Sequence, residues 1–215
     1  MTRGLFLTFE GPDGSGKSTQ VRMLAEHLTQ QGYAVLVTRE PGGTDIGEQI
    51  RSVILRPENT AMAPVTEVLL YAACRAQIVQ ELIRPALEAG QIVLCDRFLD
   101  SSVVYQGYGR GLLDAVNGIN AFATDGLAPD LTILLKIGAQ AGLARIREKT
   151  RDRIESESAA WHEQVYAGYL ALEQANPERI RGIDANGSVS EVHDAVLRVV
   201  SPLLDASASG AGEAL

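Results

Sequence analysis

Short apolar runs alternate with segments of helical spacing along the whole chain. The runs of strand length cover residues 5–9, 34–37, 92–95, 131–135 and 180–183. Between them, apolar residues recur three and four positions apart in the segments 17–31, 46–55, 65–88, 115–124, 139–148, 159–175 and 189–204. This alternation is typical of a parallel sheet whose strands are joined by crossover helices. The pattern predicts a three-layer α/β fold with a five-stranded parallel sheet flanked by helices.

The same pattern predicts one domain. We find no internal repeat and no interior linker, and 215 residues is a length that one compact domain fills. Residues 1–205 are therefore expected to form a single domain. Residues 206–215 are rich in Ala, Ser and Gly, so we expect them to form a flexible tail.

The composition of the chain disfavours some classes of binding partner. The chain is 46% hydrophobic and has a net charge of −8, which disfavours a nucleic-acid-binding surface or an anionic membrane surface. Its first apolar run is too short for a signal peptide or a membrane span. Cys74 and Cys95 each lie in an apolar run and are expected to be buried thiols. We therefore expect a cytoplasmic protein with no nucleic-acid partner and no membrane partner.

A glycine-rich loop follows the first apolar run directly. Its sequence is Gly11-Pro12-Asp13-Gly14-Ser15-Gly16-Lys17-Ser18-Thr19, and a helical segment follows. This fits the phosphate-binding pattern G-x-x-x-x-G-K-[ST] in its required strand–loop–helix context. Backbone N–H groups and the helix N-terminus bind phosphates, Lys17 reaches the outer phosphates, and the Ser18 hydroxyl binds Mg²⁺. The loop predicts a P-loop NTPase fold that binds a nucleotide, a class that includes kinases, ATPases, GTPases and switches.

Two further strand ends carry charged residues at the edge of the sheet where ligands of open α/β sheets bind. Arg39 follows the second run and precedes Pro41, although an ordinary turn with a solvated arginine also fits. Asp96 closes the third run, as in a Walker B element, and is placed to hold Mg²⁺. Arg97 is then placed to clamp a phosphate. Alternatively, Asp96 and Arg97 pair with each other or cap a helix.

Two polar clusters are compatible with a base-binding site. Tyr71 and Arg75 are four residues apart on one helical face, where the ring could stack on a base and the guanidinium could donate to its carbonyl. The alternative makes Tyr71 a core residue and Arg75 part of an ion pair. Ser102, Tyr105 and Gln106 form the second cluster, next to Ser101, which would fit a helix cap.

A basic segment near residues 145–155 concentrates positive charge in an acidic chain. It contains Arg145, Arg147, Lys149, Arg151 and Arg153. Such a run is usually a solvated helix face, but an arginine-rich lid over a triphosphate would stabilise charge during transfer. A GTPase is disfavoured because neither Lys136 nor Lys149 lies in an Asn-Lys-x-Asp element.

Taken together, these motifs resemble the thymidylate kinase family of the bacterial type. The resemblance covers residues 4–204 and rests on the phosphate loop with its internal acid, Arg39-Glu40-Pro41-Gly42-Gly43-Thr44, Tyr71-Ala72-Ala73-Cys74-Arg75, Asp96-Arg97-Phe98, Ser101-Ser102, Tyr105-Gln106-Gly107 and Asp152-Arg153-Ile154-Glu155. It implies a nucleoside-monophosphate-kinase-like fold. It also implies a homodimer, and a role in dTTP synthesis through ATP-dependent phosphorylation of dTMP to dTDP with Mg²⁺.

The resemblance assigns roles in the acceptor site. It implies that Asp13 contacts the sugar 3′-hydroxyl of dTMP while Arg39 and Arg97 hold its phosphate. Tyr71 takes the position of the base-stacking aromatic, and Arg75 that of the arginine that reads a thymine carbonyl.

The same resemblance assigns the remaining acceptor residues. Ser102 lies where a polar residue contacts the base, Tyr105 lies where a ring crowds the 2′ position, and Gln106 joins them as a substrate-binding residue. The family commonly has an aspartate where this chain has Lys136, so the pairing there stays open.

The catalytic cations are expected to be Lys17, Arg97 and the lid arginines Arg147, Arg151 and Arg153. The variable positions of the phosphate loop include no base, so the chain resembles the members whose catalytic arginine lies in the lid. Which lid arginine it is stays open.

The mechanism needs no general base, because a nucleoside monophosphate is mostly ionised at neutral pH. The three histidines, His27, His162 and His193, are accordingly expected to be surface residues. Two alternatives to dTMP phosphorylation stay open: a kinase of another nucleoside monophosphate and a non-catalytic nucleotide switch.

Overall fold

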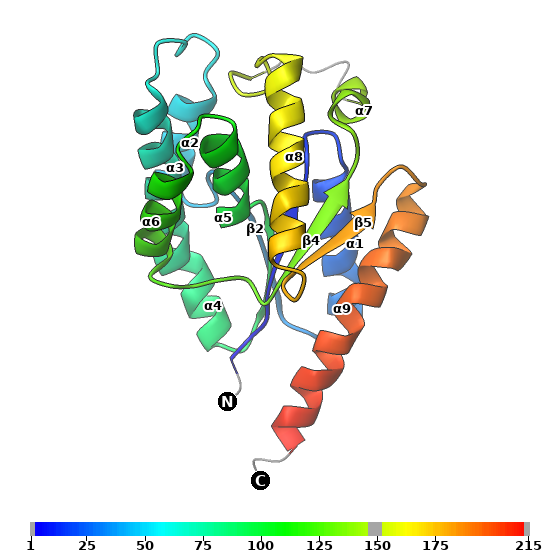
Figure 1. Ribbon diagram of the computed structural model, residues 1–215. Helices are drawn as coiled ribbons and strands as arrows, with labels where there is room; N and C mark the ends of the chain where they lie inside the picture. The colour runs from blue at the N-terminus through cyan, green and yellow to red at the C-terminus, as the bar shows by residue number, and fades with distance from the viewer. Residues whose placement is uncertain (1–2, 146–151, 213–215) are drawn as a thin grey trace.

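A computed structural model describes residues 3–145 and 152–212, and its centre is a parallel sheet (Figure 1). The strands are β1 (Phe6–Glu10), β2 (Val35–Arg39), β3 (Ile92–Asp96), β4 (Leu131–Lys136) and β5 (Ile180–Asp184). They pair in the order β2-β3-β1-β4-β5, and every pairing is parallel. The prediction of a five-stranded parallel sheet is confirmed.

Helices connect successive strands. They are α1 (Lys17–Gln30), α2 (Asp45–Leu55), α3 (Pro64–Ile78), α4 (Arg84–Glu88), α5 (Leu99–Ser102), α6 (Leu113–Thr124), α7 (Ala139–Ala144), α8 (Ala159–Ala175) and α9 (Val189–Gly212). Two π-helical segments, η1 (Val79–Ile83) and η2 (Val103–Tyr108), continue α3 and α5. No helix in the described part of the chain is long and apolar enough to cross a membrane.

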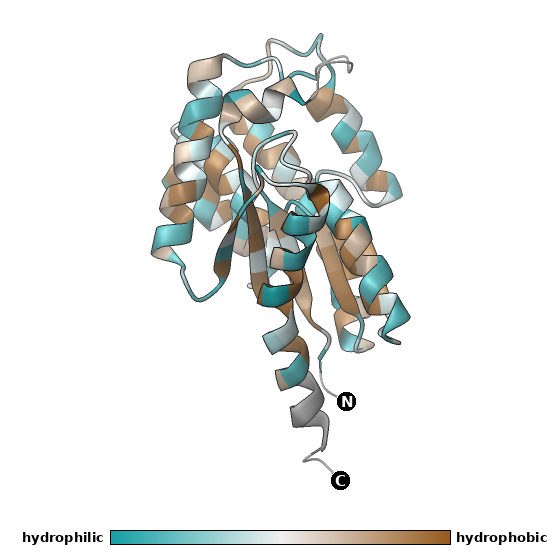
Figure 2. Cartoon of the chain, turned by 90° about the vertical axis from the view of Figure 1, so that its right-hand side faces the viewer, coloured by the Kyte–Doolittle hydropathy of each residue, from teal (hydrophilic) through white to brown (hydrophobic). Residues whose placement is uncertain are grey.

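One face of the sheet is covered by α1 and α9. Leu24 and Leu28 of α1 and Val196 and Val200 of α9 are fully buried against strand residues such as Leu135. Because both faces are covered, the central strands β1, β3 and β4 are apolar almost throughout, unlike half-exposed strands with alternating polarity. In Figure 2 the strands are accordingly largely brown, while most teal residues lie in the helices and loops.

The opposite face is covered by the run from α3 to α4 and by η2 and α8. In the run from α3 to α4, Ile78 and Ile83 pack on Phe6. Tyr105 of η2 and Tyr169 of α8 pack near Leu134. The carboxyl ends of all five parallel strands therefore meet at one edge of the sheet, and the loops that leave this edge carry most of the predicted site residues.

Three segments differ from the expected elements. The helical segment 65–88 contains the π-helical segment η1, which separates α3 from α4, where Pro85 has no N–H to donate. Residues 99–108 are helical although their apolar residues lack a clear helical spacing. Helix α9 continues to Gly212, so it includes most of the expected tail, because alanine and serine are compatible with a helix.

Candidate active site

A cleft of about 420 Å³ opens at the carboxyl edge of the sheet. It brings together residues that are far apart in the sequence but follow β1, β2 and β3 or lie on α3 and η2. Its lining includes Asp13, Gly14, Gly16, Lys17, Ser18, Thr19, Arg39, Tyr71, Arg75, Asp96, Arg97, Tyr105 and Gln106.

The phosphate loop folds through backbone conformations that favour glycine. Gly14 and Gly16 have φ values of 75° and 93°, and Gly16 is the residue before α1. A Cβ at Gly14 would lie 2.1 Å from the carbonyl oxygen of Gly142 in α7. The loop therefore packs directly against α7, and any larger residue at position 14 would push the two segments apart.

Lys17 lies inside the loop with its ammonium group on backbone carbonyls. Its Nζ donates to the carbonyl oxygens of Gly11 at 3.0 Å and Pro12 at 2.9 Å, and the residue is buried. Burial, followed by the nearby Arg97, lowers the pKa of Lys17 to about 8. The charge is costly in this position, so an incoming phosphate would stabilise it.

Ser18 and Asp96 meet at the mouth of the cleft. The Ser18 hydroxyl donates to Oδ2 of Asp96 at 2.5 Å. A hydroxyl and a carboxylate are hard oxygen donors of the kind that Mg²⁺ takes, usually with phosphate oxygens and water. No group of three or more His, Cys, Asp or Glu side chains that could hold a metal occurs among the described residues. The pair fits the partial protein contribution of a magnesium–nucleotide site.

Arg97 pairs with the acid of the phosphate loop. Its Nη2 donates to Oδ1 of Asp13 at 2.6 Å, and its guanidinium lies over the ring of Tyr105, 5.1 Å from the centroid. Burial acts to raise the pKa of Asp13, but Arg97 and Lys17 outweigh it and lower the pKa to about 2. Asp96 faces Ser18 instead, so the alternative of an Asp96–Arg97 pair is wrong.

The Tyr105 hydroxyl also donates to Asp13, at Oδ2 and 3.3 Å. Asp13, Arg97 and Tyr105 therefore form one connected group on the floor of the cleft.

Arg39 lies at the exposed side of the cleft. It ends β2, and its Nη2 donates to both carboxylate oxygens of Glu48 on α2, at 2.8 and 3.0 Å. The side chains of Arg39 and Glu48 are 52% and 44% exposed. An ion pair this exposed contributes little to stability, so Glu48 can give way to a ligand.

Arg75 is buried with all five of its N–H groups engaged. Nε and Nη2 donate to Oε2 of Glu40 at 2.9 and 2.6 Å, and Nη2 also donates to the carbonyl of Phe98. Nη1 donates to Ser102 at 3.0 Å and to Asn120 at 2.7 Å. Arg75 therefore forms an ion pair with Glu40, as the alternative prediction for this residue expected.

Glu40 and Asn120 were not among the predicted site residues. Glu40 is buried, and burial, partly offset by Arg75, raises its pKa to about 7. Its Oε1 is buried without a hydrogen-bond partner among the described residues. Glu40 belongs to the motif that contains Arg39, and Asn120 is a polar residue in an apolar helix, so each had a weak signal in the sequence.

The remaining predicted base-site residues lie around Arg75. Tyr71 is half-buried and lines the cleft one helical turn before Arg75. Ser102 accepts from Arg75, as described above. Gln106 is almost fully buried, and its amide donates to Oε1 of Glu67 at 2.9 Å.

The basic segment is only partly within the described residues. Arg147 and Arg151 lie outside them. Arg145 lines the cleft, and its Nη2 donates to the carbonyl of Ala185 at 3.1 Å. Arg153 was expected to act in catalysis, but its Nη1 donates to Glu67 at 2.6 Å and its Nε to the carbonyl of Ile54. These contacts tie Arg153 to α2 and α3.

Two sequence expectations need correction. Ser101 does not cap a helix, because α5 begins at Leu99 and the Ser101 side chain is buried against Glu10. His162 is not a surface residue: it is 7% exposed, and its Nε2 is buried without a partner in the described part of the chain. The expectation for the cysteines is confirmed, because Cys74 and Cys95 are both free and buried.

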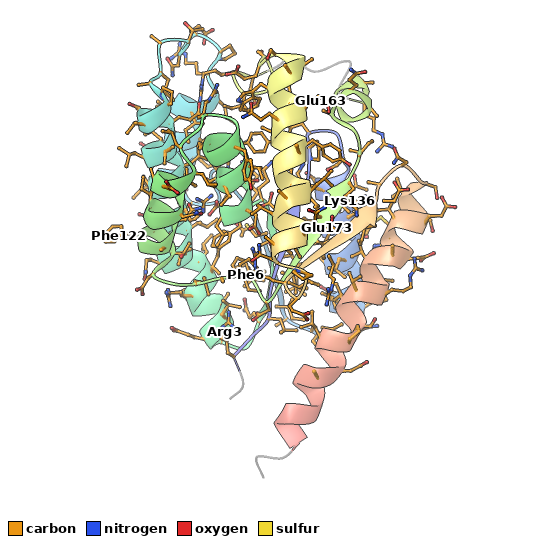
Figure 3. All side chains as sticks on the ribbon, viewed as in Figure 1. Arg3, Phe6, Phe122, Lys136, Glu163 and Glu173 are labelled. Atoms are coloured by element: carbon orange, nitrogen blue, oxygen red, sulfur yellow. The ribbon has the colours of Figure 1, made fainter. Side chains whose placement is uncertain are left out.

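Lys136, which stands where the family commonly has an aspartate, has an acidic partner nearby. Its Nζ donates to both carboxylate oxygens of Glu173 on α8, at 3.1 and 3.2 Å (Figure 3). The lysine at the end of β4 thus forms an ion pair with Glu173, outside the cleft.

Comparison with known proteins shows what this chain is similar to. A family model described as thymidylate kinase matches residues 9–196. A thymidylate kinase from an Exiguobacterium species is 54% identical over 196 residues, which are 90% of this chain and 92% of the relative. One from Bacillus pumilus is 49% identical over 205 residues, 94% of this chain and 97% of the relative. The crystal structure of thymidylate kinase from Ehrlichia chaffeensis aligns with a TM-score of 0.76 at 31% identity, covering 93% of this chain and 99% of that chain.

Proposed function

Since the chain belongs to the thymidylate kinase family, we propose that its cleft transfers the γ-phosphoryl group of ATP to dTMP with the residues described below. The activity of the family is ATP-dependent phosphorylation of dTMP to dTDP, a step toward dTTP. The observation that carries the assignment of residues is the convergence of Lys17, Arg39 and Arg97 on one cleft from three different strand ends.

Arg97 and Arg39 bind the acceptor phosphate in this proposal. Each now pairs with a carboxylate, Asp13 or Glu48, so a phosphate offers the same charge-assisted hydrogen bonds that each arginine already makes. Asp13 is then free to contact the sugar 3′-hydroxyl. Tyr105 lies beside Asp13 and limits the space at the 2′ position.

The thymine base lies between Tyr71 and the polar residues around Arg75. Tyr71 stacks on the ring, and Ser102 contacts its edge. Because every N–H of Arg75 already has an acceptor, a thymine carbonyl must share Nη1 with Ser102 or Asn120. Gln106 borders this site, and its hydrogen bond to Glu67 fixes its side chain there.

ATP binds on the other side of the transfer point. Residues 11–19 enclose its phosphates with backbone N–H groups, and Lys17 exchanges the carbonyls of Gly11 and Pro12 for phosphate oxygens. Ser18 and Asp96 would hold Mg²⁺, which neutralises charge on the phosphates when bound.

The transfer itself depends on positioning and charge. The acceptor phosphate is mostly ionised at neutral pH, so no residue has to remove a proton before in-line attack. Arg97 and Lys17 fix the two reacting phosphates. We assign the additional catalytic arginine to Arg147 or Arg151, because the contacts of Arg153 hold it against Glu67 and the carbonyl of Ile54.

We also propose that the protein is a homodimer. Helices α2, α3 and α6 pack together and carry exposed apolar side chains, among them Val53, Leu69 and Phe122. Phe122 is 90% exposed and points away from the body (Figure 3). Such a surface fits a second copy of the chain. A light-scattering mass tests this, with Phe122→Glu expected to reduce it to that of a monomer.

The partners of this enzyme are the small molecules ATP and dTMP, and we place it in the cytoplasm. The two free, buried thiols support a reducing compartment.

A coupled ATP-consumption assay tests the acceptor. It compares dTMP with dUMP, UMP, CMP, AMP and dGMP, and dTMP is expected to give the highest kcat/KM. Because dUMP lacks one methyl group, we expect it to be poorer by about 10- to 200-fold. A stronger response to another monophosphate would reassign the acceptor, and ATP hydrolysis that no acceptor stimulates would indicate a switch.

A further inference from the structure

Glu10, the last residue of β1, is a buried carboxylate that the proposed mechanism does not use. It is 0% exposed and immediately precedes the phosphate loop. Four groups donate hydrogen bonds to it: the backbone N–H of Phe98 and Ser101 to Oε1, at 2.8 and 3.1 Å, and the hydroxyls of Ser101 and Tyr169 to Oε2, at 2.6 and 2.8 Å. The carboxylate of Glu10 accepts in each of these four hydrogen bonds, as suits an ionised group.

The same two hydroxyls also contact Arg97. Nη1 of Arg97 lies 3.2 Å from Oγ of Ser101 and 3.1 Å from the Tyr169 hydroxyl oxygen. A hydroxyl has only one proton. The two hydroxyl oxygens are 3.2 Å apart, but each makes a shorter contact to Glu10, so both protons point at the carboxylate. Both oxygens therefore present lone pairs to Arg97.

Glu10 also holds the backbone that carries Arg97. Arg97 has a φ of 71°, a strained conformation that non-glycine residues rarely adopt. The N–H of Arg97 donates to the carbonyl of Phe9 at 2.9 Å, and the next N–H, that of Phe98, donates to Glu10. Two bonds to the end of β1 thus fix the turn.

The remaining donors of Arg97 point to a ligand. Nη1 is used by Gly11, Ser101 and Tyr169, and Nη2 donates to Asp13. No described residue accepts a hydrogen bond from Nε. The contacts on Nη1 therefore orient the guanidinium. Nε is left to a ligand, and Nη2 would exchange Asp13 for a phosphate oxygen.

We propose that Glu10 is the positioning residue of the acceptor-phosphate site: through the Ser101 and Tyr169 hydroxyls and the Phe98 N–H, it fixes the guanidinium of Arg97 in the orientation that binds the phosphate of dTMP. The inference rests on the proposed role of Arg97. Glu10 does not touch the substrate itself.

Neighbouring charges are consistent with this role. Burial and the nearby Asp100 raise the pKa of Glu10, while Arg97 lowers it. Asp100 is itself paired with Arg179, at 2.6 and 2.8 Å, and accepts from Thr132 at 3.0 Å. Glu10 is therefore an acid kept in a costly environment, with Arg97 as the neighbouring cation that favours its charge.

The decisive variant is Glu10→Gln, which keeps the shape of the side chain. If the amide nitrogen replaces Oε2, it donates to both hydroxyls and turns their protons toward Arg97, which has no acceptor. We expect the KM for dTMP to rise about 10- to 100-fold, while the KM for ATP stays within about twofold. Calorimetry should show the same loss for dTMP and none for thymidine, which lacks the phosphate.

Two further variants control for a loss of stability or of folding in Glu10→Gln. Asp100→Asn removes another buried carboxylate, on α5, which accepts from Thr132 and Arg179 and makes no hydrogen bond to Arg97. At a similar loss of Tm it is expected to leave the dTMP to thymidine affinity ratio unchanged. If Glu10→Gln does not fold, Tyr169→Phe removes one hydroxyl alone and is expected to weaken dTMP binding about threefold to tenfold, again without affecting thymidine.

Arg97→Ala separates the two proposals. If it leaves dTMP affinity unchanged, Arg97 does not bind the phosphate and both proposals are wrong. If it weakens dTMP binding and Glu10→Gln does not, only the positioning role is overturned. If Glu10 acts through Arg97, adding Glu10→Gln to Arg97→Ala causes no further loss, whereas an additive loss would contradict the inference.

Discussion

The floor and the rim of the cleft hold their cations in opposite ways. The floor contains Lys17, Arg75 and Arg97, and the Arg75 side chain is 1% exposed with five hydrogen bonds. The rim contains Arg39, whose side chain is 52% exposed and whose partner is a single exposed glutamate. In the proposed mechanism both regions bind the same substrates, but only the floor is built into the core.

The difference follows from the cost of burying charge. A buried cation must have its hydrogen-bonding groups satisfied before the ligand arrives, because water cannot reach it. A floor cation is therefore held in position before the ligand binds. Removing its partner is expected to destabilise the folded protein. A rim cation contributes little to folding, so its loss should affect binding alone.

Lys17→Ala should cause the largest change, in activity and not in stability. Removing the ammonium group from the phosphates is expected to lower kcat about a thousandfold or more. Because burial lowers the pKa of Lys17 to about 8, its charge costs free energy in the folded protein, and the unfolding free energy should stay within about 1 kcal/mol. Steady-state kinetics and urea unfolding measure the two effects.

Lys136→Ala is the matched control for that experiment. Lys136 pairs with Glu173 outside the cleft, so its loss should leave kcat near the wild-type value. Near-normal turnover of Lys17→Ala would remove the phosphate-loop mechanism.

Glu40→Gln should change how stability depends on pH. The pKa of Glu40 is raised from 4.5 to about 7 in the folded protein. The folded state therefore holds this proton more tightly than the unfolded state, and the contribution of Glu40 to stability is greatest below pH 4.5 and is lost as the pH rises through about 7. The difference amounts to at most about 3 kcal/mol. Glutamine does not titrate, so this part of the pH dependence should disappear.

Urea unfolding between pH 4.5 and pH 8 measures that change in slope. Glu48→Gln makes the same chemical change at an exposed position of the rim and should leave the slope as it is. Equal slopes for Glu40→Gln and the wild type would mean that the floor ion pair does not carry the expected cost of burial.

Local spacing accounts for what the sequence predicted well. The phosphate loop is one continuous motif, and the alternation of short apolar runs with helical segments is a local pattern, so both could be read without knowledge of the fold. The family resemblance is confirmed by the matching family model and by relatives near 50% identity. Arg97 could be placed at the sheet edge because it directly follows a strand.

The supporting residues could not be predicted, because their partners are distant in sequence. Glu10 and Ser101 are 91 residues apart, and Arg75 and Asn120 are 45 apart. Nothing near Glu10 in the sequence indicates that it accepts four hydrogen bonds. The contact of Arg153 with Glu67 joins residues 86 positions apart, so the sequence could not indicate it.

Arg39→Ala should have the smallest effect and tests the rim directly. Its ion pair with Glu48 is solvated, so removing it is expected to change the unfolding free energy by less than about 0.5 kcal/mol. The KM for dTMP should rise about tenfold, because one charge-assisted contact to the phosphate is lost. Binding of thymidine, which lacks that phosphate, should not change.

Glu48→Gln decides whether that loss is specific to the phosphate. It keeps Arg39 but removes the carboxylate that competes with the ligand for the same guanidinium. The KM for dTMP should therefore stay the same or fall slightly, because less has to be displaced. A tenfold rise in Glu48→Gln as well would show that the salt bridge itself shapes the site, and that the rim is as pre-positioned as the floor.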